Sequence, residues 1–164
     1  MGNIWRFNTL KKATQGAVYC TDEAHECKQF YKGTKDYENV GATKHLNFLL
    51  VIHIANERFS DDPRHMGWVR KLVLMGMLLG LPDYIVIWRM KGAVLFDIGF
   101  LEFKSYKGKK PLKDVTEEER IKKLGVKQKP WRQFFKLYQI KYEIPLSAKE
   151  GLDHLVDWGV FNLK

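Results

Sequence analysis

Two extended segments joined by a short turn constrain the fold of this chain more than any other feature. Tyr84–Trp88 is a short apolar run, Met90–Gly92 makes a turn, and Ala93–Lys104 is a long extended segment. This arrangement is typical of a β-hairpin. An earlier apolar run rich in β-branched residues, LNFLLVIHI at 46–54, predicts another buried strand. The chain is therefore expected to build a β-sheet.

Helices are expected before, between and after these strands. The segment Thr21–Lys32 begins with a Thr/Asp cap, has acidic residues in its first turn and is followed by Gly33, so it predicts a helix that stops there. A polar loop is expected at 35–43, and a short helix at 116–124 with a capping box between Thr116 and Glu119. Further helices are expected at 68–77, 128–137 and 148–158, and an extended segment at 139–144. This order predicts an α/β fold with a mixed sheet flanked by helices.

Length and composition limit the class of protein. A chain of 164 residues fits one domain, and 45% hydrophobic with 29% charged residues excludes a largely disordered chain. No apolar run reaches the ~20 residues that span a bilayer. The N-terminus lacks an apolar signal core, so a cytoplasmic protein is expected, with Cys20 and Cys27 as free thiols.

The net charge of +9 is concentrated in one segment. Residues 104–141 contain thirteen basic and four acidic residues, whereas the rest of the chain contains fifteen of each kind. A basic segment of this kind suits a polyanion, because each neutralised phosphate releases a condensed counterion. A solvated, lysine-rich face is the alternative, and the charge alone does not decide between them.

Asp83, Glu102 and Lys104, which lie in or next to the predicted hairpin strands, are the candidate catalytic residues. Side chains two residues apart in a strand share a face, so Glu102 and Lys104 are expected to be exposed together while Leu101 and Phe103 face the core. If the strands pair, Asp83 reaches the same point, where two carboxylates suit Mg²⁺ with open coordination positions. Such a centre fits phosphodiester hydrolysis. The alternative is an ordinary Glu-Lys surface ladder on an edge strand.

The sequence around these residues resembles a known family. GLPDYIVIW at 80–88, FLEFKSYKGK at 100–109 and QKPW at 128–131 are similar to the core of the PD-(D/E)xK nucleases. The likeness is specifically to the VRR-NUC family, in its compact stand-alone form found in phages and bacteria. IHIANER at 52–58 and the following helix-like segment resemble what precedes that core in the family. The resemblance covers roughly 21–158 and implies a restriction-endonuclease-like fold.

The resemblance also implies roles for individual residues. Asp83 and Glu102 would bind a catalytic Mg²⁺ or Mn²⁺ ion, Lys104 would be the catalytic lysine, and Gln128 would support the site. The family places another glutamate near the metal on its first helix, and here Glu23 is favoured over Glu26. The residues expected to bind the substrate are Lys107, Lys109, Lys110, Arg64 and Arg70.

Two features depart from the family pattern. Ala55 stands where proline is commoner, and residues 113–127 are expected to be an insertion, either a substrate-gripping lid or a solvated loop. Residues 1–20 are interpreted as an N-terminal extension and 21–164 as a single nuclease domain. Trp131, Phe134 and Phe135 have the spacing of a helix face, so they are expected to pack in the core rather than stack on bases.

The function implied is a metal-dependent, structure-specific endonuclease that cuts branched DNA or Holliday junctions. A homodimer is expected, because two strands must be cut, and the setting would be the cytoplasm of a bacterial cell or a phage-infected host. A sequence-specific restriction-type nuclease is one alternative. A non-catalytic nucleic-acid-binding module is another, although such a module has no need of carboxylates that face a polyanion.

Overall fold

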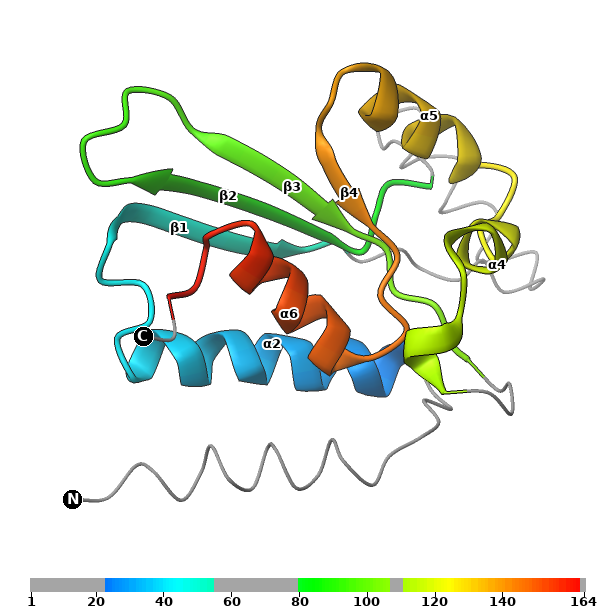
Figure 1. The fold of residues 1–164 in the computed structure, drawn as a ribbon, viewed down its shortest axis with the longest axis horizontal. Helices are drawn as coiled ribbons and strands as arrows, with labels where there is room; N and C mark the ends of the chain where they lie inside the picture. The colour runs from blue at the N-terminus through cyan, green and yellow to red at the C-terminus, as the bar shows by residue number, and fades with distance from the viewer. Residues whose placement is uncertain (1–22, 55–79, 107–110, 163–164) are drawn as a thin grey trace, which may run out of the picture.

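The computed structural model describes residues 23–54, 80–106 and 111–162, and a four-stranded sheet lies at the centre of this part of the chain (Figure 1). The strands are β1 (Leu46–His53), β2 (Tyr84–Met90), β3 (Asp97–Leu101) and β4 (Lys141–Glu143), in the order β1-β2-β3-β4. The β1/β2 and β2/β3 pairs are antiparallel, and the β3/β4 pair is parallel. The predicted hairpin is confirmed, and so is the α/β class with its mixed sheet, which is consistent with a restriction-endonuclease-like core.

Helices flank the sheet, and two of them build the main core. The described helices are α2 (Glu23–Asn39), η1 (Leu112–Asp114), α4 (Glu117–Lys122), α5 (Lys129–Leu137) and α6 (Ala148–Asp157). Figure 1 shows α2 and α6 next to each other on one side of the sheet. Their apolar side chains bury the inward-facing residues of β2 and β3. The largest buried side chains of this core are Phe30, Tyr84, Trp88, Leu101, Phe103, Leu155 and Phe161.

The first helix is longer than the sequence predicts. It was expected to stop at Gly33 before a polar loop at 35–43, but α2 continues to Asn39. Gly33 instead marks a close approach of two helices, because a Cβ there would lie 2.6 Å from Cδ1 of Leu152 on α6. The missing side chain therefore serves helix packing, which a local stop rule cannot distinguish from helix termination.

The second strand of the hairpin is shorter than predicted. The extended segment was expected to span Ala93–Lys104, but β3 covers Asp97–Leu101 and the residues before it are exposed. Beyond Leu101 the backbone still pairs: Glu102 N donates to Glu143 O at 3.0 Å, and Lys104 N donates to Pro145 O at 3.1 Å. These two bonds hold the chain in place where the candidate residues lie.

The opposite face of the sheet is covered at one end by α5. Phe135 on α5 stacks on Phe100 of β3 with ring centroids 4.2 Å apart. At the other end, Phe48, Leu50 and Ile52 of β1 are exposed. The two faces therefore differ: one carries a packed apolar core, and the other carries α5 above the end of β3.

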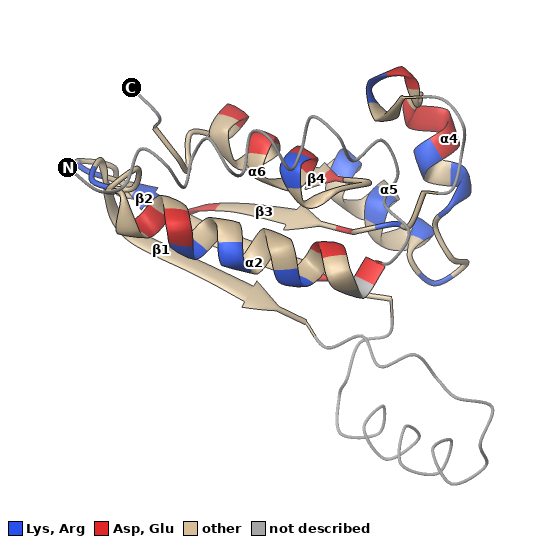
Figure 2. Cartoon of the chain, turned by 90° about the horizontal axis from the view of Figure 1, so that it is seen from below, with Lys and Arg blue, Asp and Glu red and all other residues tan. Residues whose placement is uncertain are grey.

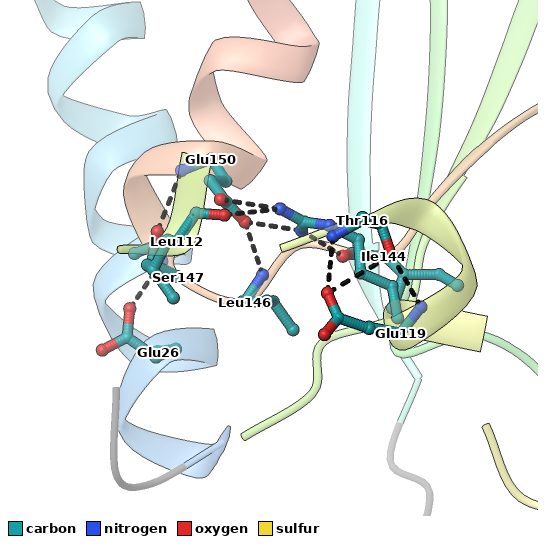
Figure 3. Close-up of polar contacts among 10 residues, drawn as sticks. Glu26, Leu112, Thr116, Glu119, Ile144, Leu146, Ser147 and Glu150 are labelled. Atoms are coloured by element: carbon teal, nitrogen blue, oxygen red, sulfur yellow. Dashed lines mark hydrogen bonds and ion pairs between the residues drawn. The ribbon is translucent and has the colours of Figure 1, made fainter. Parts of the chain in front are cut away.

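The predicted insertion at 113–127 packs on the body of the protein. Its helix α4 begins with the predicted capping box, in which Glu119 N donates to Thr116 Oγ1 and Thr116 N donates to Glu119 Oε2. Arg120 of this helix donates to both carboxylate oxygens of Glu150 on α6, at 2.8 and 3.0 Å, and to Ile144 O at 2.9 Å (Figure 3). Val115 and Leu124 are buried. A plain solvated loop is therefore a wrong description of this segment, and a role in gripping substrate stays a prediction.

Several expected elements lie outside the described residues. These are the N-terminal extension at 1–20 and the helix at 68–77. Among the helices that the structure describes, none has the length and apolar character needed to cross a bilayer.

Candidate active site

The carboxylates of Asp83 and Glu102 lie at the same end of the hairpin. Tyr84 pairs with Leu101, so the residue before β2 stands opposite the residue after β3. Asp83 Oδ2 accepts a hydrogen bond from Phe103 N at 2.7 Å, which fixes its side chain against the second strand. The structure therefore brings together the two acidic residues that the sequence singles out.

Glu102 is buried, which the sequence did not predict. It was expected to be exposed beside Lys104, yet only 1% of its surface is accessible. The reason is that β3 lies between β2 and β4 and that the N-terminal end of α5 covers this face of the sheet. The alternative of a Glu-Lys surface ladder on an edge strand is therefore wrong, because β3 is a central strand.

Two donors converge on one oxygen of Glu102. Lys104 Nζ and Gln128 Nε2 each lie 2.5 Å from Glu102 Oε1. Gln128 precedes the first residue of α5, and its own Oε1 accepts a hydrogen bond from Gly125 N at 2.8 Å. Because the Gly125 N–H needs an acceptor, the amide of Gln128 is oriented with its NH₂ group toward the carboxylate.

Among the residues that the structure describes, the second oxygen of Glu102 has no hydrogen-bond partner, and it is buried. Burial raises the pKa of Glu102 to about 8, the nearby charge of Asp83 acts in the same direction, and Lys104 opposes both. An unpaired, buried carboxylate oxygen is costly, because desolvation is not repaid by any contact. Such an atom in a native structure indicates either strain or a partner that binds there.

Lys104 is held in its charged form. Burial lowers its pKa, but the charge of Glu102 and the hydrogen bond to it outweigh burial, so the pKa lies above its ordinary value. Its side chain is 13% exposed, against 1% for Glu102. Lys104 is therefore a positively charged side chain that binds the buried carboxylate of Glu102 and is itself partly accessible to solvent.

The structure separates the two glutamates of the first helix. Glu26 Oε2 accepts a hydrogen bond from Ala148 N at 2.5 Å, so this side chain is bound at the start of α6. The charge of Glu23 raises the pKa values of both Glu102 and Lys104, which places it on the side of the site. Of the two candidates, Glu23 is the one whose charge acts on Glu102 and Lys104.

The pair Asp83 and Glu102 fits a divalent cation. Within residues 23–54, 80–106 and 111–162, no three His, Cys, Asp or Glu side chains are grouped closely enough to hold a metal ion, so Glu23 does not complete a three-residue set. Mg²⁺ commonly takes only one or two carboxylates and keeps several waters. Asp83 and Glu102, which stand opposite each other in the strand register, are therefore the residues that would hold such an ion.

Tyr142 is a neighbour that the sequence gave no reason to choose. Burial raises the pKa of its hydroxyl, and the charges of Glu102 and Asp83 raise it further. It comes from β4, where it pairs with Phe100 and stacks against Phe135. Gly125 is a second residue that was missed, although a glycine three positions before Gln128 is a recognisable turn pattern.

The substrate-binding residues expected from the sequence cannot be placed. Lys107, Lys109, Lys110, Arg64 and Arg70 lie outside the described residues. In the described part of the basic segment, Figure 2 shows basic residues on α5 and both basic and acidic residues on α4. Arg120 and Arg132 are paired with Glu150 and Glu117, whereas Lys129 and Lys136 on α5 are exposed.

Comparisons of the chain with protein-family models, with curated proteins and with solved structures found no match. The fold and the geometry of Asp83, Glu102, Lys104 and Gln128 therefore carry the functional argument, together with the resemblance of the sequence motifs.

Proposed function

We propose that this protein is a metal-dependent endonuclease that hydrolyses phosphodiester bonds in DNA. The observation that carries the proposal is Oε2 of Glu102, which is buried with no hydrogen-bond partner among the described residues while Lys104 and Gln128 bind the other oxygen. The strand register puts Glu102 opposite Asp83. A buried carboxylate oxygen that lacks a hydrogen bond destabilises the folded protein. Its presence here therefore favours a ligand-binding role for Glu102 over a structural one. Mg²⁺ or Mn²⁺ is the ligand that suits it.

Each residue of the site has a distinct part in this chemistry. The bound cation would stabilise the negative charge that develops on the phosphate and activate the attacking water. Asp83 and Glu102 would hold the cation, with Glu23 adding negative charge nearby. Lys104 stays protonated and can donate to a phosphate oxygen or orient the nucleophile. Gln128 keeps the carboxylate of Glu102 in one orientation.

The proposed substrate is DNA, with branched DNA favoured. The excess of basic residues at 104–141 supports a polyanionic partner, and this segment contributes Lys104 and Gln128 to the site. The preference for Holliday junctions or other branches rests on the resemblance to stand-alone VRR-NUC nucleases. We place the reaction in the cytoplasm of a bacterial cell or a phage-infected host.

The active species is proposed to be a homodimer. One chain carries one pair of carboxylates at this site, whereas resolution of a four-way junction requires cuts in two strands related by approximate two-fold symmetry. Two copies related by a two-fold axis meet this requirement. Sedimentation with and without junction DNA tests it, and a strict monomer that cuts each strand independently contradicts it.

The decisive experiment incubates the purified protein with linear, flapped and four-way-junction DNA in Mg²⁺, Mn²⁺ or EDTA. The same substrates are given to Asp83→Asn, Glu102→Gln and Lys104→Ala. We expect cleavage in Mg²⁺ or Mn²⁺, none in EDTA, and none with the three variants. Asp97→Asn is the matched control, because Asp97 lies on the same strand but is exposed and 3.7 Å from Lys141; it should cleave as the original protein does.

DNA binding separates this proposal from a non-catalytic binding module. The variants should still bind junction DNA in EDTA, since they remove negative charge or one lysine from a larger basic segment. Binding without cleavage by the original protein in either metal would favour the binding module. Near-normal cleavage by Glu102→Gln would remove the assignment of this site.

A further inference from the structure

Aromatic rings are exposed on the outer side of α5. Phe135 is buried against Phe100 and Tyr142, as its helical spacing predicted. Phe134 is 45% exposed and Tyr138 is 62% exposed, so the prediction of core packing is wrong for Phe134. The reason is that residues 134 and 135 are about 100° apart around a helix, and only one of them can face the sheet.

These rings form a continuous row. Phe134 lies edge-on to Trp131 with centroids 6.2 Å apart, and it contacts Tyr138 at 4.7 Å. Trp131 in turn stacks on the buried Phe135 at 5.9 Å. The exposed rings are therefore supported from beneath by rings that belong to the core. A rigid, supported aromatic surface loses little side-chain entropy when a planar ligand binds to it.

The charge around this row suits a nucleic acid. The sequence of α5, KPWRQFFKL, contains no acidic residue, and Lys129 and Lys136 are exposed on it. Arg132 is already paired with Glu117. Lysines beside exposed aromatic rings are the combination that binds single strands, because the lysines meet phosphates while the rings stack on bases. The exposed lysines next to the rings favour a nucleic acid over an apolar protein partner.

The row also lies at a useful distance from the candidate active site. Gln128, immediately before α5, contacts Glu102, and Phe134 and Tyr138 follow six and ten positions later. At 1.5 Å per helical residue this separation is about 9–15 Å. Such a length corresponds to about three to four stacked nucleotides at 3.4 Å each. A cleaved strand that runs along α5 would bring its neighbouring bases to the rings.

We propose that Phe134 and Tyr138 form a stacking platform for unpaired nucleobases next to the cleavage site. This inference rests on the proposed nuclease function and adds to it the class of DNA that the site prefers. Branches and flaps supply unpaired bases, whereas an intact duplex keeps its bases stacked within the helix. The platform thus selects DNA structure without reading sequence, because every base has a face that stacks.

Binding in EDTA, where no cation is present, tests the platform directly. The two probes are a duplex with a five-nucleotide single-stranded flap and a flush duplex of equal length, with 2-aminopurine in the flap. Phe134→Ala and Tyr138→Ala should each weaken flap binding ~5- to 150-fold and leave flush-duplex binding unchanged. Quenching of 2-aminopurine on binding should also be lost. Equal losses on both probes, or no loss, would overturn the proposal.

Two controls define the meaning of a loss. Tyr31→Ala removes a ring that is also 45% exposed but lies on α2, outside the basic segment, and it should leave flap binding unchanged. Phe134→Leu keeps apolar surface but removes the ring, so it should bind the flap as poorly as Phe134→Ala. Binding by Phe134→Leu equal to that of the original protein would contradict stacking.

A change of oligomeric state in Tyr138→Ala, measured by sedimentation without DNA, would show that a second copy covers this surface.

The outcomes distinguish this proposal from the one on which it rests. If the original protein quenches the flap probe but never cleaves DNA in Mg²⁺ or Mn²⁺, the platform stands and the nuclease assignment fails. If it cleaves DNA but the ring variants bind both probes normally, the nuclease assignment stands and the platform fails.

Discussion

Glu150 and Glu102 each form an ion pair with a basic side chain, but they differ in how many of their carboxylate oxygens accept a hydrogen bond. Glu150, in the first turn of α6, accepts from both terminal nitrogens of Arg120 and from Leu146 N, so both of its oxygens are satisfied (Figure 3). One oxygen of Glu102 accepts from Lys104 and Gln128, and the other is buried with no hydrogen-bond partner in the described part of the chain. The first arrangement holds helices together, while the second retains capacity for a ligand. The number of hydrogen bonds that each carboxylate accepts, rather than the presence of an ion pair, therefore distinguishes Glu150 from the proposed metal ligand Glu102.

The largest expected difference between the two glutamates is in cleavage. Glu102→Gln should lower the rate of junction cleavage in Mg²⁺ by at least about 100-fold, because it removes a ligand from the reacting centre. Glu150→Gln should change the rate by less than about threefold once the protein is folded. Gel assays under single-turnover conditions measure both rates, and similar losses in the two variants would erase the distinction.

The next largest effect is on the pH dependence of stability. In EDTA, burial and the charge of Asp83 raise the pKa of Glu102 from 4.5 to about 8. Between these values the folded protein keeps a proton that the unfolded chain releases, so this group's contribution to stability falls as the pH rises. The loss approaches roughly 5 kcal/mol at most. Relative to the original protein, Glu102→Gln should therefore become progressively more stable from pH 4.5 to 8, and urea unfolding at several pH values measures the difference.

A constant difference between the two proteins over this pH range would show that Glu102 is ionised throughout. Addition of Mg²⁺ or Mn²⁺ at pH 8 should stabilise the original protein and leave Glu102→Gln unchanged, because a ligand stabilises only the state that binds it. The same titration with Glu150→Gln serves as the control, since this variant leaves the residues of the proposed metal site unchanged.

The contacts of Glu150 with Arg120 and Leu146 should affect the stability of the protein rather than its rate of DNA cleavage. Glu150→Gln leaves Arg120 without its charged partner and weakens the bond to Leu146 N, so we expect the free energy of unfolding to fall by about 1–3 kcal/mol. Urea unfolding at pH 7 measures this change. A stability equal to that of the original protein would mean that the bidentate pair contributes nothing beyond its desolvation cost.

The smallest effect is expected at a third glutamate. Glu118 lies on the exposed side of α4, so Glu118→Gln should change stability by less than about 0.5 kcal/mol and leave cleavage unaltered. The same two assays supply the measurement. A large effect here would show that removal of any negative charge alters the protein, and the contrast between Glu102 and Glu150 would then lose its meaning.

Local patterns were enough to predict much of the fold. The apolar runs at 46–54 and 84–88 became β1 and β2, and Thr116 with Glu119 formed the expected capping box. Gly33 was misinterpreted because its role depends on Leu152, which lies far away in the sequence. Rules based on neighbouring residues succeed where neighbours decide the structure and fail where a distant helix does.

The acidic residues of the candidate site were predicted from the sequence, but their burial was not. Asp83 and Glu102 were singled out from strand periodicity and pairing, and the structure places them opposite each other. Their burial was missed, because it depends on β4 and α5, which cover this end of the sheet only after the chain has crossed over. Gln128 was suggested only by the resemblance, since no local pattern connects it with a carboxylate 26 positions earlier.

The parallel pairing of β3 with β4 also determines when the site can form. The β2/β3 hairpin closes locally, whereas Glu102 N and Lys104 N bond to carbonyls about forty residues later, and closure of a longer loop costs more chain entropy. Contacts between residues far apart in sequence are expected to form later during folding than local ones. A nascent chain would therefore acquire its hairpin before α5 and β4 enclose Glu102. The acidic pair would remain solvated, and unable to hold a cation in the enclosed geometry, until the final quarter of the polypeptide has folded over it.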